Sequence, residues 1–171
     1  MTLDRFIRPP ADVVRTHSEN GMIDQMSIVI DAPPQLLWDL VTDITGMGRW
    51  SPENRRGRWL DNGQTPRTGA WFLGFNRIGP VMWVTPCEVT AVEPLEHFEF
   101  QVHIVGPRWG YRLEPDPLGT LVTEYREWPY TSGFHRLLRW SGPLGRPRDN
   151  HALNGIPQTL RALKAYAESH S

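Results

Sequence analysis

Glu124 is the acidic residue whose sequence position most favours chemistry. It lies in the β-type stretch Thr120–Trp128, where alternation places it on one strand face with Val122 and Arg126. A buried carboxylate is costly unless it is paired, and loss of water raises its pKa toward the range useful in acid–base catalysis. Three interpretations stay open for Glu124: a structural ion pair with Arg126, a polar anchor for a ligand, or a catalytic acid or base.

Four other polar residues are candidates for the same site. Tyr111 and Arg126 are the candidate partners of Glu124 in proton transfer. Asn76 precedes a tight Gly-Pro turn, and it either satisfies backbone groups of that turn or orients a ligand carbonyl. Glu53 follows Trp-Ser-Pro, and it either caps a nearby helix or belongs to a ligand site.

Large rings supply much of the apolar material, with 8 Trp, 6 Phe and 4 Tyr in 171 residues. They either fill an ordinary core or line a ligand cavity, since such cavities are largely aromatic with a few polar groups. Alternation along the strands selects the residues that share an inward face: Phe98, Phe100, Val102, Trp109, Tyr111 and Leu113, and on the strand before them Val81, Trp83, Thr85, Cys87 and Val89. We expect Trp50, Trp83, Phe100, Trp109 and Tyr111 to form the walls of such a cavity.

Other chemistries find little support in the sequence. The six His form no HxxxH or HExxH pair, so we expect no metal site and no cofactor. No serine lies in a GxSxG elbow, and Cys87, the single cysteine, has no adjacent His and is expected to be an inert buried thiol. The net charge of −1 gives no overall basic field, so we expect no nucleic-acid partner. The local run Arg55, Arg56 and Arg58 is either a solvated strand or a rim that attracts an acidic ligand.

The elements that must position these residues follow from hydrophobic periodicity. Seven strands are expected, at Met22–Ile30, Arg55–Leu60, Ala70–Asn76, Val81–Val92, His97–His103, Trp109–Glu114 and Thr120–Trp128. Pro86 suggests that its strand has an edge position or a bulge. A helix is expected to start at Pro33-Pro34, and a second short helical turn lies within Asp43–Pro52.

The C-terminal part is expected to be helical. Ile156, Leu160, Leu163 and Ala167 recur at spacings of 4, 3 and 4, which predicts one amphipathic helix from about Asn154 to Ser169. A short helix is expected around Phe134–Trp140, and Ser141–Pro147 is expected to be a flexible hinge.

The remaining expectations concern the ends and the location of the chain. Residues 1–20 look like an N-terminal leader, and residues 21–169 form a single domain. Neither a signal peptide nor a run of roughly 20 apolar residues is present in the sequence. We therefore expect a cytoplasmic protein without integral membrane contact. The strong preference for arginine over lysine hints at a GC-rich genome.

An ordered set of short motifs resembles the START/Bet v1-like (SRPBCC) superfamily, and within it the polyketide cyclase/dehydrase-type branch found in actinobacteria. The motifs are Ile30-Asp31-Ala32-Pro33-Pro34, Leu37-Trp38-Asp39-Leu40-Val41-Thr42-Asp43, Met47-Gly48-Arg49-Trp50-Ser51-Pro52-Glu53, Gly69-Ala70, Asn76-Arg77-Ile78-Gly79-Pro80, Cys87-Glu88-Val89-Thr90 with Glu93-Pro94, and Gly119-Thr120-Leu121-Val122-Thr123-Glu124. The resemblance runs from about Ser27 to Ala167 and implies an α+β helix-grip fold. In that fold a seven-stranded curved antiparallel sheet surrounds a long C-terminal helix, with two short helices after the first strand.

The resemblance also implies where side chains point. It places Glu124 on the cavity side, Glu53 at the cavity mouth, and Phe72, Gly74 and Asn76 inside. Trp71, Leu73 and Phe75 would then form an exposed apolar row, for which a homodimer is the expected partner. The segment Phe134–Gly145 would act as a lid.

The function implied by the resemblance is binding of a small hydrophobic molecule, aromatic, polyketide-like or lipid-like, by a carrier or sequestering protein. The alternative is a polyketide cyclase or dehydratase that uses acid–base residues in the same cavity. The superfamily holds both classes of protein, and the fold does not decide between them.

Overall fold

The computed structural model describes residues 11–17, 21–61, 65–103, 106–129 and 145–171. Its main element is one eight-stranded antiparallel sheet of order β1-β2-β8-β7-β6-β5-β4-β3. The strands are β1 (Val14–His17), β2 (Gly21–Ile30), β3 (Asn54–Trp59), β4 (Trp71–Ile78), β5 (Val81–Glu93), β6 (His97–Val102), β7 (Arg108–Asp116) and β8 (Gly119–Pro129). The helices are α1 (Pro34–Thr42), the 3-10 turn η2 (Met47–Arg49) and α3 (Gly145–Glu168). The expected α+β class and the curved antiparallel sheet are confirmed. Of the two short helices expected after the first long strand, the first is α1 and the second is only the 3-10 turn η2.

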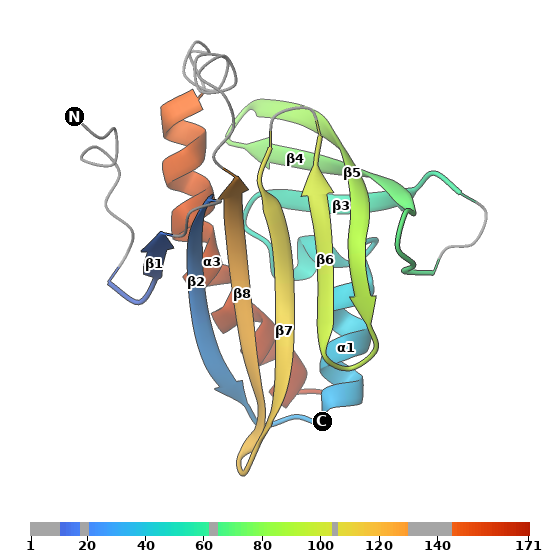
Figure 1. The fold of residues 1–171 in the computed structure, drawn as a ribbon, viewed down its shortest axis with the longest axis vertical. Helices are drawn as coiled ribbons and strands as arrows, with labels where there is room; N and C mark the ends of the chain where they lie inside the picture. The colour runs from blue at the N-terminus through green and yellow to red at the C-terminus, as the bar shows by residue number, and fades with distance from the viewer. Residues whose placement is uncertain (1–10, 18–20, 62–64, 104–105, 130–144) are drawn as a thin grey trace.

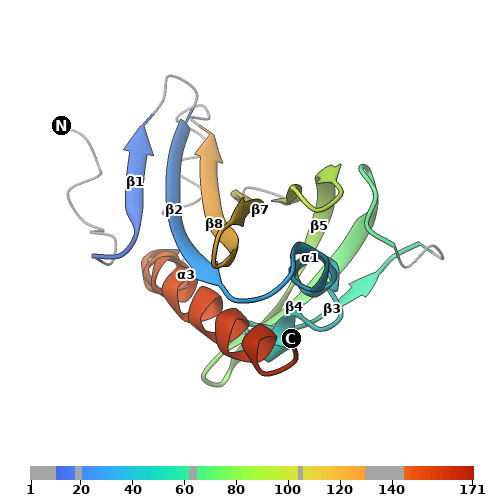
Figure 2. The same cartoon turned by 90° about the horizontal axis from the view of Figure 1, so that it is seen from below.

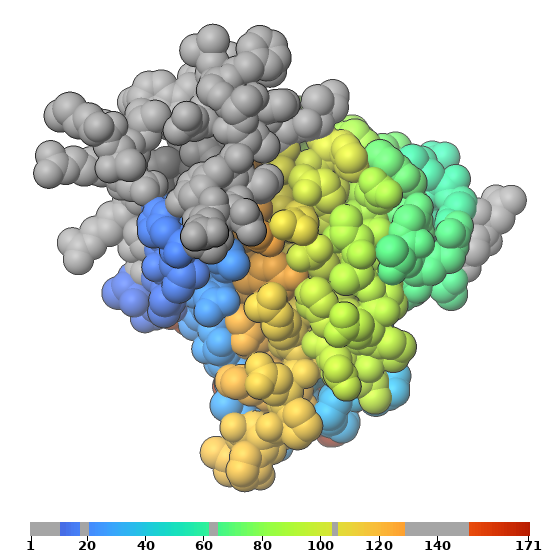
Figure 3. Space-filling model, viewed as in Figure 1, coloured from blue at the N-terminus to red at the C-terminus, as the bar shows by residue number. Residues whose placement is uncertain are grey.

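The sheet is strongly bent, and both α3 and α1 lie on its concave side (Figures 1 and 2). The opposite side carries no helix over its central strands, whose atoms form a continuous surface in Figure 3. Helix α3 crosses the concave face next to β2 and β8, so the layer between them forms much of the core.

The expected number of seven strands was wrong, because β1 adds an eighth. β1 lies within the segment expected to be a leader, and it pairs antiparallel with β2. Val14-Arg15-Thr16-His17 has a single apolar residue, so no hydrophobic alternation marks it as a strand. Its attachment is polar: Arg15 Nε lies 2.6 Å from Asp24 Oδ1 of β2.

Pro86 lies in an internal strand, β5, but just before the point where β5 begins to pair with β6. β5 lies between β4 and β6 in the sheet, and the register shift of β5 falls between Val89 and Ala91, so the expected bulge at Pro86 was wrong. The Pro86 carbonyl accepts the backbone N–H of His103, just beyond the end of β6. A strand residue points its N and its C=O to the same side, so the missing N–H of Pro86 faces a place where regular pairing has already ended.

Helix α3 begins nine residues earlier than the periodicity predicts. Gly145–Pro147, expected to be part of a hinge, already belong to the helix, while the rest of that segment and the expected helix around 134–140 lie outside the described residues. Proline is tolerated in a first helical turn because the N–H groups there have no helical partner. The predicted stripe of Ile156, Leu160, Leu163 and Ala167 is confirmed, since all four are fully buried.

Helix α1 starts as expected, with Pro33 at its N-cap and Pro34 in its first turn. Leu37, Leu40 and Val41 give it a buried face. No helix within the described residues is long and apolar enough to cross a membrane.

Candidate functional site

Glu124 lies on the concave face of the sheet, in the central strand β8. The register places Glu124 opposite Met26 of β2 on one side and opposite Tyr111 of β7 on the other. Opposed residues in an antiparallel pair point to the same side of the sheet, and Tyr111 in turn faces Phe98 of β6. Glu124 is only 4% exposed, so it is a carboxyl group in an apolar row.

The described partner of Glu124 is the hydroxyl of Tyr111. Tyr111 Oη donates to Glu124 Oε1 at 3.2 Å, and both groups are buried. Burial raises the pKa of Glu124 to about 8, although the hydrogen bond from Tyr111 opposes this rise. Burial and the neighbouring Glu124 raise the pKa of the Tyr111 hydroxyl well above its ordinary value. At neutral pH the pair therefore holds two protons in an apolar environment.

The second carboxylate oxygen of Glu124 has no hydrogen-bond partner among the described residues. Oε2 is buried, and neither a backbone N–H nor a side-chain donor reaches it. Nearly all buried polar atoms in proteins are hydrogen-bonded, so an exception needs an explanation. A protonated carboxyl group in this position can make one more hydrogen bond through this oxygen, either as donor or as acceptor, to a further molecule.

Arg126 pairs with Asp24, so the first of the three interpretations left open for Glu124, an ion pair with Arg126, is not the pairing that the structure describes. Arg126 Nη2 lies 2.9 Å from Asp24 Oδ2, and Asp24 also binds Arg15. Asp24 and Arg126 are almost fully buried, and the guanidinium lies 5.9 Å from the centre of the Trp109 ring. The sequence analysis missed Asp24. The sequence could have indicated it, because alternation places Asp24 on one strand face with Met22, Met26 and Ile28, where it is the one polar residue.

Asn76 lies on the inner side of β4, as the resemblance implies, and does not bond the following turn. Its Nδ2 donates to Thr85 Oγ1 of β5 at 2.8 Å, and its Oδ1 accepts from Asn54 Nδ2 of β3 at 3.2 Å. Asn54, missed by the sequence analysis, keeps a buried Oδ1 that has no partner among the described residues. The three side chains form a polar strip across β3, β4 and β5.

The expected aromatic wall residues divide into a packed group and a half-buried group. Phe72 and Phe100 are buried against each other, with ring centres 5.2 Å apart in an edge-to-face arrangement. Trp50 is buried against Tyr166 of α3 at 6.0 Å, so it anchors the helix. Trp83 and Trp109 are half-buried. The packed rings thus behave as core, and Trp109 lies between the Arg126 guanidinium and Phe100, its opposite residue on β6.

Two further candidates have ordinary structural settings. Glu53 is half-buried after η2, and its backbone N–H bonds Ser51 Oγ while its carbonyl accepts from Arg77. Cys87 is buried, and burial raises the pKa of its thiol to about 12, which keeps it protonated and unreactive. The described residues contain no group of three or more His, Cys, Asp or Glu side chains placed to hold a metal ion.

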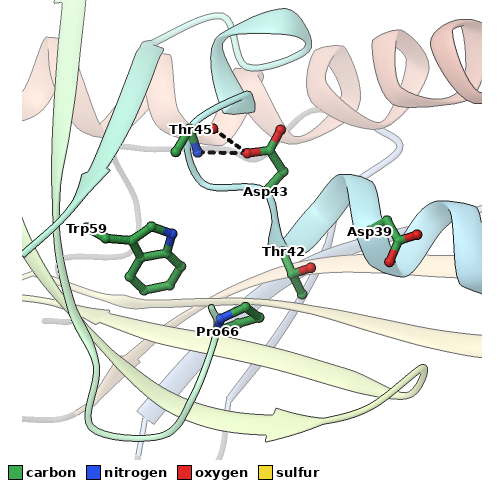
Figure 4. Close-up of a pocket in the computed structure, with 6 residues that line it drawn as sticks. All are labelled: Asp39, Thr42, Asp43, Thr45, Trp59 and Pro66. Carbon is green, nitrogen blue, oxygen red and sulfur yellow. Dashed lines mark hydrogen bonds between the residues drawn. The ribbon is translucent and has the colours of Figure 1, made fainter. Parts of the chain in front are cut away.

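A pocket of about 260 Å³ lies between α1 and the edge strand β3, and Glu124 is not among the residues that line it. The sequence analysis did not foresee this pocket. Trp59 and Pro66 border one side, and Asp39 and Thr42 of α1 border the other (Figure 4). Asp43 at its rim already accepts hydrogen bonds from Thr45 and is paired with Arg49 at 2.7 Å. Both carboxylates at the pocket therefore already have partners within the protein, since Asp39 also accepts a hydrogen bond from Gln35.

The outer apolar row expected on β4 is only partly exposed. Trp71 is the exposed member and stacks on His103, whereas Leu73 and Phe75 are half-buried. The expected lid, Phe134–Gly145, lies outside the described residues except for its last residue, the first of α3.

Comparison with known proteins identifies the family of the chain. Residues 25–168 match the protein family described as polyketide cyclase / dehydrase and lipid transport. None of the curated proteins compared with the chain gives a significant match.

Solved structures share the fold over most of its length. The Polyketide_cyc-like protein Cgl2372 from Corynebacterium glutamicum is 32% identical over 90% of this chain and 95% of its own, with a TM-score of 0.62. MLL2253 from Mesorhizobium loti is 21% identical over 87% and 98% of the two chains, also with a TM-score of 0.62. Ms6760 from Mycobacterium smegmatis is 17% identical over 93% and 99%, with a TM-score of 0.62. Because the family match covers most of the chain, the chain belongs to the polyketide cyclase / dehydrase and lipid transport family.

Proposed function

We propose that this protein binds a small hydrophobic molecule against the concave face of its sheet, beneath α3, as a carrier or sequestering protein. The family includes lipid transport by its description, which supports binding of an apolar ligand. Apolar and aromatic side chains from β6, β7 and β8 line this face, and burying a ligand there contributes about 25 cal/mol per Å² of apolar area.

The observation that carries the proposal is the buried, incompletely bonded carboxyl group of Glu124. A carboxyl group that only stabilised the fold would have both oxygens satisfied, as Asp24 has through Arg15 and Arg126. Glu124 instead has one bond, from Tyr111, and one oxygen without a partner among the described residues. With a pKa of about 8 it is protonated at neutral pH and can donate to a neutral oxygen. The ligand we propose is therefore apolar with a carbonyl or hydroxyl oxygen.

A polyketide cyclase or dehydratase is the second candidate function. A pKa of about 8 suits a general acid or base near neutral pH, because efficient proton transfer requires a pKa close to the working pH. Ionised Glu124 would accept a proton from the carbon between two ketones. As the carboxylate is neutralised, the Tyr111 hydroxyl would turn from Glu124 and donate its one hydrogen bond to the enolate oxygen formed. Arg126 is less suited to this role because Asp24 already binds it.

A pair of ligands that differ only in a carbonyl tests the proposed binding. 2-Acetylnaphthalene offers an oxygen acceptor and 2-ethylnaphthalene does not, and each is titrated by displacement of the neutral dye N-phenyl-1-naphthylamine. We expect the wild type and Glu124→Gln to prefer the ketone by about tenfold, because both side chains can donate. Glu124→Met keeps the length of the side chain without a donor, and we expect it to lose that preference. The matched control Glu114→Gln changes an exposed residue of the neighbouring strand.

Two outcomes would contradict the proposals. If the dye and both naphthalenes fail to bind the folded wild type, the binding function is wrong. Turnover of a linear poly-β-ketone decides the second candidate: a wild type that cyclises it, with Glu124→Gln binding but not turning it over, supports an enzyme. A wild type that binds the ketone without changing it supports a carrier.

A further inference from the structure

The outer face of the sheet carries an apolar strip on β4 and β5, next to the edge strand β3. Phe75 of β4 lies opposite Val84 of β5, and the neighbouring pair joins Arg77 to Met82. Met82 is 74% exposed and Val84 is 52% exposed. On the other side Phe75 faces Arg56 of β3, so arginine borders the apolar strip from two directions.

These arginines differ from most of the other arginines whose side chains the structure describes. Arg56 lies with its guanidinium 4.9 Å from the centre of the Phe75 ring, and Arg77 Nε donates to the Gly79 carbonyl. Within the described part of the chain, neither they nor Arg58, which faces Leu73, has an acidic partner within 4 Å. Elsewhere the structure places arginines against carboxylates, as in the pairs at Asp24, Asp43, Asp61, Asp12 and Glu127.

The surface formed by Arg56, Arg58, Phe75, Arg77, Met82 and Val84, here called the outer patch, is thus apolar and positively charged. The whole chain has a formal net charge of −1, so the positive charge of this patch is a local feature. Two carboxylates of β5 lie on the same outer face, Glu88 and Glu93, and both lie beyond the patch. Glu88 bonds His103 at 3.1 Å, and Glu93 lies opposite His97 of β6.

We propose that the outer patch docks the protein on the surface of an anionic lipid bilayer. Exposed Met82 and Val84 would enter the headgroup region, while the arginines would bind lipid phosphates and keep their alkyl stems against the apolar strip. Attraction by the anionic surface and burial of apolar area are two signals that together give reversible binding. This surface is separate from the Glu124 site, so the two proposals stand or fall independently.

Other occupants fit the outer patch less well. A second copy of the chain, the partner expected from the sequence, would set arginines against arginines across a two-fold axis. Nucleic acid would engage the arginines but would leave exposed Met82 and Val84 against a charged backbone. An anionic bilayer matches both the charge and the apolar side chains.

Vesicle flotation with the full chain tests the proposal. We expect the protein to float with vesicles of phosphatidylcholine containing 30% phosphatidylglycerol at 0.1 M salt, and to remain behind with pure phosphatidylcholine. Because screening weakens the attraction, we expect binding to fall markedly at 0.5 M salt. Failure to float with the anionic vesicles would overturn the proposal.

Three variants locate the binding surface. We expect Arg56→Gln with Arg58→Gln to weaken binding at least tenfold, since two charges are removed near the anionic surface. Met82→Ser with Val84→Ser removes the apolar component, and we expect a further distinct loss that persists at high salt. The matched control is Arg112→Gln with Arg161→Gln, which removes the same charge at exposed positions outside the patch and should bind like the wild type.

Three outcomes would overturn the assignment. Equal binding by the patch variants and the wild type, with circular dichroism showing native folds, would place the contact elsewhere. A dimer in light scattering that Met82→Ser with Val84→Ser converts to monomer would assign the patch to a second copy. Release of the protein from vesicles by excess RNA, with tight RNA binding that depends on Arg56 and Arg58, would assign it to nucleic acid.

Discussion

Asp24 and Arg126 form an ion pair across β2 and β8 that is almost entirely withdrawn from solvent, with 2.9 Å between Oδ2 and Nη2. This pairing leaves Glu124, two residues earlier on the same strand face, to the weaker donor Tyr111. The two acids therefore lie in different electrostatic environments, although they belong to neighbouring cross-strand pairs on the same face of the sheet. Asp24 has two arginines, and Glu124 has a single neutral hydroxyl among the described residues.

The stability of the protein should fall as pH rises from about 5 to 8. In the unfolded chain Glu124 ionises in its ordinary range, whereas in the folded chain it keeps its proton until about pH 8. Unfolding therefore releases a proton in this window, and the free energy of unfolding decreases by up to about 1.4 kcal/mol per pH unit until ionisation of the folded state ends the decrease. Urea denaturation at several pH values measures this slope.

Glu124→Gln should flatten the slope between pH 5 and 8, because glutamine does not ionise. Glu114→Gln, on the solvent-facing side of β7, should leave the slope as it is in the wild type. Parallel pH profiles for the wild type and Glu124→Gln would show that the folded state does not hold the Glu124 proton.

Tyr111→Phe should raise the pKa of Glu124 above that of the wild type. The hydroxyl of Tyr111 stabilises the ionised carboxylate, and its removal leaves desolvation unopposed. Carbon-13 NMR of the Glu124 side-chain carboxyl measures the titration midpoint. Tyr125→Phe is the matched control, because Tyr125 bonds Glu99 at 2.7 Å on the other face and should not move this midpoint. A lowered midpoint in Tyr111→Phe would contradict the described hydrogen bond.

Most strands and the buried stripe of α3 could be predicted from the sequence because their apolar residues follow a regular period. β1 could not, since its strand is held by the Arg15–Asp24 ion pair rather than by an apolar face. The first turns of α3 were missed because glycine and proline at 145–147 favour a loop by local preference. A helix that is stabilised by packing along its later turns can extend through residues of low helix propensity.

The burial of Glu124 could be predicted for the same reason as the strands, because alternation places it among apolar residues. Its partner could not, because spacing along β8 offers Arg126 and does not show which residue of the next strand, β7, lies opposite Glu124. Only the cross-strand register decides, by setting Arg126 opposite Asp24 and Glu124 opposite Tyr111.

Asp24→Asn should destabilise the protein by about 3–5 kcal/mol. The substitution keeps the side-chain shape but removes the carboxylate that two arginines share, and the loss of an acidic partner from a buried guanidinium is strongly unfavourable. Asp12→Asn is the matched control, because Asp12 pairs with Arg161 at an exposed site where such pairs contribute about 0–1 kcal/mol. Thermal and urea denaturation measure both variants. Equal losses for the two substitutions would show that burial of the Asp24 pair has little energetic weight.

Two glycines should respond to alanine in opposite directions. A Cβ at Gly110 would lie 2.3 Å from the Tyr125 hydroxyl, and that ring is fixed by hydrogen bonds to Glu99 and His97, each at 2.7 Å. Gly110→Ala should therefore cost about 1–3 kcal/mol, as overpacking does elsewhere.

At Gly155, inside α3, the nearest atom is Pro52 Cγ at 3.4 Å, an ordinary contact. Gly155→Ala should stabilise the protein by about 0.5–1 kcal/mol, because alanine loses less backbone entropy than glycine in a helix. Urea denaturation of the two variants and the wild type measures whether each substitution raises or lowers the free energy of unfolding. A stabilised Gly110→Ala would mean that Tyr125 leaves its hydrogen bonds at little cost. A destabilised Gly155→Ala would mean that α3 cannot shift away from Pro52 even by a few tenths of an ångström.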